Sequence, residues 1–160
     1  MLEICPLNQA PDALNQCLYW CDREWGGQSG FAFEDWVAEF RRIESDPVDE
    51  VFVALADGAP VGMVWMLERE GLATHAHLSP WVSNLIVDPD HRDAGVARAL
   101  LDHVESYLAA GGDTCAYLLA QAPGNYFTKG WEVLDTARLR NGHVFVMQKE
   151  FNSSRDVFAN

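Results

Sequence analysis

The sequence predicts an α/β (α+β) fold, with about six to seven strands in a central sheet and about four helices flanking it. Short apolar runs bounded by turn residues indicate the strands, and apolar residues spaced three and four apart indicate the helices. Strands are expected over residues 2–7, 51–55, 61–67, 81–87, 115–120, 132–139 and 144–149. Helices are expected from 11 to about 25, from 33 to about 44, from 92 to 110, and as a short piece within 122–129.

In the first half of the chain, helical spacing is the clearest signal. The first helix can start at Pro11-Asp12 and is expected to end before Gly26-Gly27. Its buried face repeats at helical spacing and comprises Ala13, Leu14, Cys17, Leu18 and Cys21. The second helix is stopped by Ser45-Asp46-Pro47, and Asp57-Gly58 is a hairpin signal between the next two strands.

In the second half, glycines separate the elements. Gly111-Gly112 ends the long helix in the position where glycine is favoured. Residues 115–120 are apolar throughout, as in a strand buried on both faces beside a parallel neighbour. Asn141-Gly142 indicates a last hairpin, and residues 152–160 are expected to form a tail behind a single domain over residues 1–151.

The charge of the chain excludes one class of partner. A net charge of −13 leaves no basic footprint for nucleic acid. Residues 1–75 hold 14 Asp and Glu against 4 Lys and Arg, whereas residues 76–160 hold 10 against 7. This asymmetry favours either a solvated acidic surface or an N-terminal half that attracts a cationic substrate.

The composition also predicts where the protein resides. No apolar run approaches the ~20 residues of a membrane span, and the first ten residues lack the pattern of a signal peptide. A cytoplasmic protein without a membrane partner is therefore expected. The four cysteines, Cys5, Cys17, Cys21 and Cys115, form no CxxC pair and have no histidine at ligand spacing, so buried free thiols are expected rather than a disulfide or a metal site.

One stretch, from Leu85 to Leu108, combines a strand, a turn of small residues and the start of a helix. The first N–H groups of a helix lack partners within it, and the helix dipole adds positive charge there. Gly95, with Ala94 and Ala97, allows a bulky anion to approach the backbone. This pattern predicts a pyrophosphate site.

With these motifs in this order, the chain resembles the GNAT N-acetyltransferase superfamily. The motif of that family, Arg or Gln, two residues, Gly, one residue, then Gly or Ala, is matched by Arg92, Gly95 and Ala97. A second motif, a tyrosine four residues before a Gly-aromatic pair, is matched by Tyr126 and Gly130-Trp131. The resemblance implies a GNAT-like, mixed and mostly antiparallel sheet, and it allows a homodimer, although no stretch indicates an interface.

The resemblance implies acetyl-CoA as the acetyl donor. The backbone N–H groups from Ala94 to Arg98 would hold the pyrophosphate, with Arg92 and Arg98 beside it, although both arginines could also be plain surface residues. The residues implied to bind the cofactor are Leu85, Ile86, Val87, Arg92, Asp93, Ala94, Gly95, Val96, Ala97 and Arg98. Asp93 departs from the family pattern, which usually has glycine there.

The resemblance implies that Tyr126 is the general acid for the departing thiolate, with Phe127 as a rival for the inward position. A backbone N–H near Ile86 or Val87 could stabilise the oxyanion. The attacking amine also needs a base. The candidates are Glu68, Glu70, His75, His77 and Asp35, and no spacing selects among them.

The family places its substrate loop at the end of the first helix. Aromatic and acidic residues there predict a site for a small cationic amine such as a polyamine or an aminoglycoside. The residues are Trp20, Asp22, Glu24 and Trp25, together with Trp81. The expected function is acetyl transfer to a primary amine by direct attack in a ternary complex, and the alternatives are a peptide or protein N-α-acetyltransferase and a non-catalytic acyl-CoA-binding regulatory module.

Overall fold

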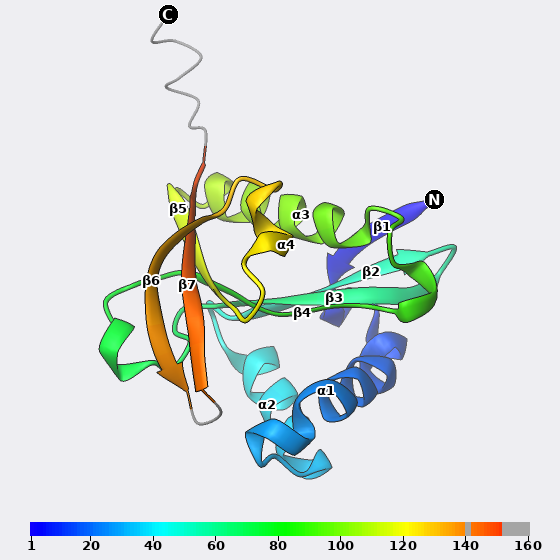
Figure 1. Ribbon diagram of the computed structural model, residues 1–160. Coiled ribbons are helices and arrows are strands. Elements are labelled where there is room, and N and C mark those ends of the chain that lie inside the picture. Colours follow the sequence, from blue (N-terminus) through cyan, green and yellow to red (C-terminus); the bar gives the residue numbers. More distant parts are fainter. Residues whose placement is uncertain (140–141, 152–160) are drawn as a thin grey trace, which may run out of the picture. The chain divides into compact units, whose positions relative to one another are not determined.

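The computed structural model of the protein describes residues 1–139 and 142–151. Seven strands form one sheet in the order β1-β2-β3-β4-β5-β7-β6. The pairs β1·β2, β2·β3, β5·β7 and β6·β7 are antiparallel, and the pair β4·β5 is parallel. The strands are β1 (Leu2–Pro6), β2 (Glu50–Ala56), β3 (Ala59–Leu67), β4 (Trp81–Val87), β5 (Cys115–Ala120), β6 (Glu132–Leu139) and β7 (Gly142–Glu150). The helices are α1 (Leu14–Ser29), α2 (Phe33–Ser45), α3 (Val96–Ala110) and the short α4 (Gly124–Phe127) (Figure 1). This arrangement confirms the predicted fold class.

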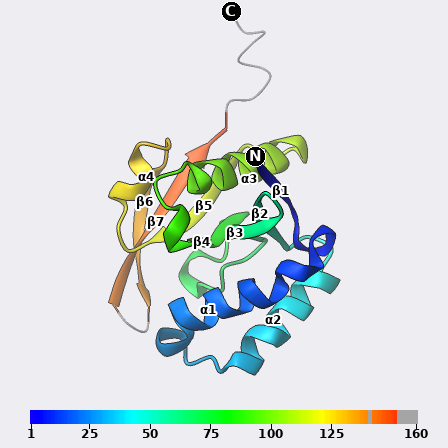
Figure 2. The same ribbon diagram turned by 90° about the vertical axis from the view of Figure 1, so that its right-hand side faces the viewer.

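The chain divides into two compact units, one formed by Met1–Met66 with Asn84–Leu101 and the other by Leu67–Ser83 with the chain from Asp102 onward. In the first unit, α1 and α2 lie side by side beneath β2 and β3 (Figure 2). Trp36 and Phe40 of α2 pack their rings on Trp65 of β3, with centroids 6.3 and 5.1 Å apart.

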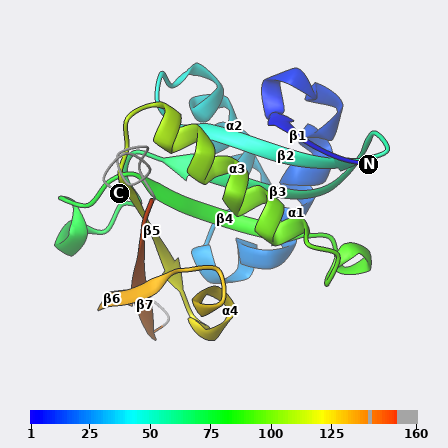
Figure 3. The same cartoon turned by 90° about the horizontal axis from the view of Figure 1, so that it is seen from above.

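The opposite face of β3 receives the first turns of α3 (Figure 3). Gly62 makes this approach possible, because a Cβ there would lie 3.0 Å from the Ile86 carbonyl oxygen and 3.0 to 3.1 Å from the side chains of Leu100 and Val96. The first unit therefore has one layer of helix on each face of β3.

In the second unit, β6 and β7 form a long hairpin beside β5 (Figure 1). The expected turn around Asn141 and the expected tail at 152–160 lie outside the described residues. β5 differs from the prediction of a strand buried on both faces: Ala116, Leu118 and Ala120 are buried, whereas Cys115, Tyr117 and Leu119 between them are half-buried. Small and apolar residues fill both sets of positions, so composition alone did not show the alternation.

Two helix boundaries also differ from the sequence prediction. α1 continues through Gly26 and Gly27 and ends at Gly30, which has the left-handed φ of 77° that favours glycine. α3 begins at Val96 rather than near Arg92, because the residues before it form a separate turn. Among the described residues, no helix is long and apolar enough to cross a membrane.

Candidate active site

The loop between β4 and α3 is held in place by Asp88. Its N–H donates to the Val61 carbonyl oxygen of β3 at 2.8 Å, and its Oδ1 accepts from the Asp90 N–H at 2.9 Å. These bonds fix the end of β4 and the short 3₁₀ turn Pro89–His91 that follows it. Asp93 and Gly95 then take left-handed conformations, with φ of 62° and 81°, and turn the chain into α3.

The N–H groups at the N-terminus of α3 face this loop. The Ala99 N–H donates to the Gly95 carbonyl oxygen at 3.0 Å, and the N–H groups of the helical residues before it belong to the first turn, where a helix supplies no acceptor of its own. The first turn contains no acidic residue. A Cβ on Gly95 would meet nothing within 4 Å, so the space over the loop is open. This geometry suits an anionic group.

The remaining residues predicted to bind the cofactor are distributed over β4 and this loop. Leu85, Ile86 and Val87 are the last three residues of β4, and only Ile86 is fully buried. The side chains of Arg92 and Arg98 are exposed on either side of the left-handed turn. The structure thus brings both arginines and the N-terminal N–H groups of α3 to one loop.

One residue of β4 was not anticipated. Asn84, in the middle of the strand, has a φ of 48°. Asparagine tolerates this left-handed conformation better than most residues, and a single such residue re-aims the strand. The sequence signal is the polar pair Ser83-Asn84 inside an otherwise apolar strand.

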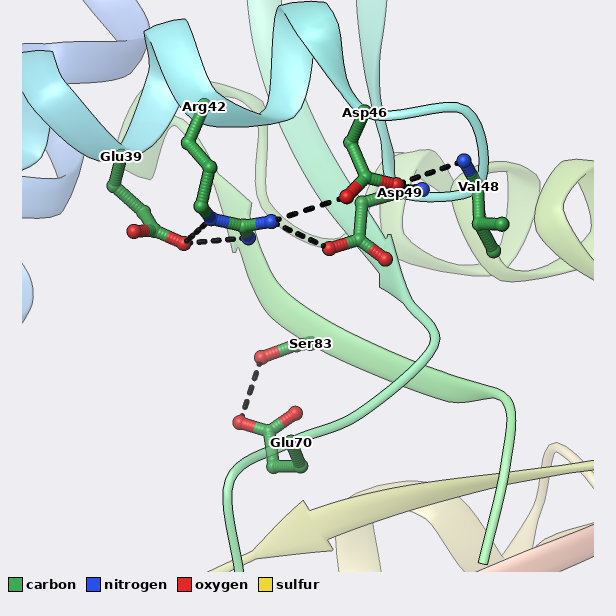
Figure 4. A network of polar contacts seen from close by, with 7 residues as sticks. All are labelled: Glu39, Arg42, Asp46, Val48, Asp49, Glu70 and Ser83. Carbon is green, nitrogen blue, oxygen red and sulfur yellow. Dashed lines mark hydrogen bonds and ion pairs between the residues drawn. The ribbon is translucent and has the colours of Figure 1, made fainter.

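In the second unit, Glu70 is the carboxylate with the most unusual environment. One oxygen, Oε1, accepts a hydrogen bond from the Ser83 hydroxyl at 3.1 Å, whereas Oε2 is buried with no hydrogen-bond partner among the described residues (Figure 4). Burial raises the pKa of Glu70 to about 7, and the Ser83 hydrogen bond opposes this shift. A carboxyl group with such a pKa can exchange a proton at neutral pH.

The other candidate bases are less suited to proton transfer. Both ring nitrogens of His75 are occupied, Nε2 by Asp135 Oδ2 at 2.9 Å and Nδ1 by Thr74 Oγ1 at 2.8 Å. Asp35 uses Oδ2 to cap α2, accepting from the Ala32 N–H at 2.8 Å. Glu68 and His77 are exposed. The geometry therefore favours Glu70 among the five candidate bases, which their sequence spacing did not distinguish.

Tyr126 lies in α4, the single helical turn that ends before Gly130. Its side chain is half-buried, whereas that of Phe127 is 54% exposed, so Tyr126 is the more enclosed of the two. Burial raises the pKa of Tyr126 above its ordinary value, which keeps the phenol protonated at neutral pH. The side chain can therefore act as a proton donor.

Comparison with known proteins identifies the family of this chain. A model of the acetyltransferase (GNAT) family matches residues 12–129. The chain belongs to this family. Membership confirms the predicted enzyme class, an acetyltransferase with acetyl-CoA as donor. A search of curated proteins found no match.

Solved GNAT structures share the fold at low sequence identity. An aminoglycoside 6'-N-acetyltransferase complexed with coenzyme A has a TM-score of 0.74 at 14% identity and covers 92% of this chain and 96% of its own. The Enterococcus faecium aminoglycoside 6'-N-acetyltransferase has a TM-score of 0.70 at 15% identity, covering 94% and 96%. The Thermoplasma acidophilum PaiA N-acetyltransferase in complex with coenzyme A has a TM-score of 0.66 at 16% identity, covering 94% and 99%.

The departure of this GNAT chain at Asp93 has a structural explanation. The residue takes the left-handed conformation for which the family usually has glycine, and aspartate is one of the residues that adopts it most readily. Its side chain is exposed, so its charge is solvated beside the loop. The turn is therefore preserved despite the substitution.

The residues predicted for substrate binding separate into two groups. Trp20 and Trp81 are each only 1% exposed, and Trp81 Nε1 donates to the Leu78 carbonyl oxygen at 2.8 Å. Both rings are core residues rather than the expected edge of a pocket, because each lies on the inward side of its element. Asp22 and Glu24 are exposed and Trp25 is half-buried at the C-terminal end of α1.

Proposed function

We propose that the protein transfers the acetyl group of acetyl-CoA to the primary amine of a small cationic acceptor, such as a polyamine or an aminoglycoside, by direct attack in a ternary complex. The main observation behind this proposal is the environment of the Glu70 carboxyl group. One of its oxygens accepts a hydrogen bond, and the other is buried without a partner among the described residues. An amine acceptor is protonated at neutral pH and must lose a proton before it can attack. Among the described carboxyl groups, Glu70 has the pKa best suited to receive this proton, because its pKa is close to neutral pH.

The loop before α3 fits the nucleotide end of the donor. The N–H groups at the start of α3, the open space over Gly95 and the two exposed arginines, Arg92 and Arg98, are features that a pyrophosphate site would use. The backbone of Leu85–Val87 would hold the pantetheine arm. When bound, acetyl-CoA supplies the acetyl group as a reactive thioester.

Two side chains of the second unit would handle the protons. The Glu70 carboxylate would take one proton from the ammonium group of the acceptor, and Tyr126 Oη would give a proton to the leaving sulfur and regain one from the nitrogen as the amide forms. The product amide bond would replace the thioester bond, and the one net proton, held by Glu70, would return to solvent. A buried carboxyl group that is readily ionised and a phenol that stays protonated are suited to these opposite roles.

Two observations support a small cationic acceptor: the acidic N-terminal half of the chain and the activities of structurally similar proteins. Two of the similar structures are aminoglycoside 6'-N-acetyltransferases, and residues 1–75 are strongly acidic. A field of this sign attracts multivalent cations to the N-terminal half. A cytoplasmic location belongs to the same proposal, since all four cysteines are free thiols, as suits a reducing compartment.

A thiol-release assay with acetyl-CoA and a panel of acceptors tests the proposal. The panel contains spermidine, kanamycin, a neutral-bodied monoamine such as benzylamine, and a peptide with a free α-amine. We expect turnover with spermidine or kanamycin at a kcat/KM at least ~10-fold above that of benzylamine, since charge complementarity raises local substrate concentration. Turnover of the peptide alone would replace this proposal with N-α-acetylation of peptides, and binding of acetyl-CoA without any turnover would replace it with a regulatory module.

A further inference from the structure

A cavity of about 300 Å³ lies in the first unit between α1, α2 and the start of β2. Its inner wall is apolar and comes from buried side chains, namely Leu18, Phe40, Ile43 and Val51. Its mouth is bordered by Leu14, which is 36% exposed, and by the charged residues that follow the middle of α2. The volume is at the lower end of the range for small-molecule sites, ~300–1,000 Å³.

The cavity is separate from the donor loop. It adjoins Glu50 of β2, which pairs with Met66, whereas the donor loop is attached to β3 at Val61. Five residues of strand separate these two points, a distance of roughly 15 Å at ~3.3 Å per residue. The cavity also borders the helices that cover one face of β3, whereas α3 covers the other.

The cavity is also displaced from Trp25, one of the residues predicted to bind the acceptor. Leu14 and Leu18 of α1 line the cavity, and Trp25 lies two turns beyond Leu18 in the same helix. At ~1.5 Å per residue, Leu18 and Trp25 are roughly 10 Å apart along the helix axis. A ligand in the cavity therefore occupies neither the donor loop nor the position of Trp25.

Two glutamates, Glu44 and Glu50, line the cavity. The Glu50 side chain is half-buried, and its Oε1 accepts a hydrogen bond from the Val51 N–H at 3.3 Å. Burial raises the pKa of Glu50, and the Val51 N–H hydrogen bond opposes this shift. Among the described residues, neither Glu50 nor Glu44 forms an ion pair.

The other charged residues at the mouth do not cancel the negative charge of Glu44 and Glu50. Asp46 is already occupied: its Oδ1 accepts from the N–H groups of Val48 and Asp49, both at 2.8 Å, and its Oδ2 lies 3.5 Å from Arg42 Nη1 (Figure 4). Arg41 contributes one exposed positive charge. Two carboxylates against one guanidinium leave the mouth acidic above an apolar wall.

We propose that this cavity is a second ligand site, which binds a small amphipathic amine with its alkyl body against the apolar wall and its ammonium group at Glu50. The alkyl body would supply van der Waals contacts that the lining lacks when the cavity holds no organic group. The ammonium group would form a charge-assisted hydrogen bond with a carboxylate that is otherwise partly desolvated. This site does not depend on the identity of the acetyl acceptor.

The test is calorimetric binding to the full chain, without acetyl-CoA, of hexylamine, hexanol and hexanoate. We expect hexylamine to bind at least ~10-fold more tightly than hexanol, because a charge-assisted hydrogen bond is stronger than a neutral one. Hexanoate should bind more weakly than hexanol, because its charge has the same sign as that of Glu50. Equal affinities for hexylamine and hexanol, or no binding of hexylamine, would overturn the proposal.

Two variants locate the binding site. Leu14→Trp places a large ring at the mouth and should weaken hexylamine binding at least ~10-fold, and Glu50→Gln should remove the preference for hexylamine over hexanol. The controls are Val133→Trp, on an exposed position of β6, and Glu34→Gln, on the exposed first turn of α2, and both should bind hexylamine as the wild type does. Hexylamine binding that survives both Leu14→Trp and Glu50→Gln would place the ligand elsewhere, including the acceptor site.

Discussion

Glu70 is the proposed base of the active site, and the burial of its carboxyl group should also reduce the stability of the fold. Its carboxyl group has one hydrogen bond, from Ser83, and a second oxygen buried without a partner among the described residues. Such a group is least favourable when it is charged. Stability alone does not favour this position, whereas the proposed role in proton transfer would account for it.

The stability of the protein should depend on pH through this residue. The pKa of Glu70 in the folded state is about 7, above its ordinary value of 4.5, so burial favours the protonated form. The protonated group contributes stability below about pH 4.5, and this contribution is lost as the pH rises to about 7. Glu70→Gln, which stays neutral, should match the wild type in unfolding free energy near pH 4 and exceed it by up to about 3 kcal/mol above pH 7. Urea unfolding at both pH values measures this, and a difference independent of pH would contradict it.

Tyr126 should act on catalysis and not on donor binding. Tyr126→Phe removes only the hydroxyl group, so we expect kcat to fall ~100-fold while the KM for acetyl-CoA changes less than about 2-fold. Tyr19→Phe is the matched control, since Tyr19 is exposed on α1 and its contact is between the ring and Arg23, which phenylalanine retains. An unchanged kcat in Tyr126→Phe would assign the proton donor elsewhere.

At the residue scale, the sequence predicted residue types better than environments. Glu70 was one of five possible bases, and only the structure shows that its Oε2 is buried while Glu68 is exposed. The reason is that the chain between β3 and β4 is irregular, so no periodicity assigns its side chains to an inside or an outside. Asp93 and Asn84 similarly adopt left-handed backbones that their neighbours in the sequence do not require.

At the scale of elements, the loop before α3 is the part whose function is most directly tested by mutation. Gly95→Glu adds bulk and negative charge where the anion should lie, and we expect acetyl-CoA affinity to fall at least ~100-fold. Gly58→Glu, in the turn between β2 and β3, is a matched control, because both glycines have positive φ and no atom within 4 Å of an added Cβ.

Both glycine variants should lose a similar ~1–2 kcal/mol of stability from the left-handed backbone. Calorimetry with acetyl-CoA and thermal unfolding separate binding from folding in the two proteins. Equal affinity in Gly95→Glu and Gly58→Glu would show that the pyrophosphate is held elsewhere.

The elements themselves were largely predictable, and the errors have physical causes. β4 has the predicted bounds, because its apolar run is interrupted on both sides by proline-containing turns. The first helix passes its expected end at Gly26, where a Cβ would lie 3.0 Å from Asp22 Oδ1, so glycine here gives room to a side chain rather than ending the helix. The start of α3 was placed too early because the left-handed turn at Asp93 and Gly95 has no signature separate from the helix it precedes.

At the scale of the whole molecule, the charge distribution should control the use of the acceptor. With a net charge of −13, concentrated in residues 1–75, the chain attracts cations through a field that salt screens. We expect kcat/KM for spermidine to fall at least ~5-fold between 20 and 300 mM NaCl, and kcat/KM for a monoamine to fall much less. Equal salt dependence for the two acceptors would indicate that the acidic half is only a solvated surface.

The family resemblance was predictable because it rests on short motifs at fixed places. Arg92, Gly95 and Tyr126 lie within a stretch whose strand and helix boundaries the sequence largely marks. The acceptor side was not predictable to the same degree. Trp20 and Trp81 are core residues and the carboxyl group of Glu70 is buried, and these facts depend on packing between segments far apart in the sequence.

The central claim is that Glu70 removes the proton from the attacking amine, and the pH dependence of kcat/KM with an acceptor such as spermidine tests it most directly. The wild type should show a rise of slope one with a midpoint near pH 7, because the carboxyl group must be ionised to act as a base. Glu70→Gln should lose this step and fall ~100-fold at pH 8, whereas Glu132→Gln, an exposed glutamate of β6, should keep both the step and the rate. A Glu70→Gln enzyme with the rate and pH profile of the wild type would contradict the account.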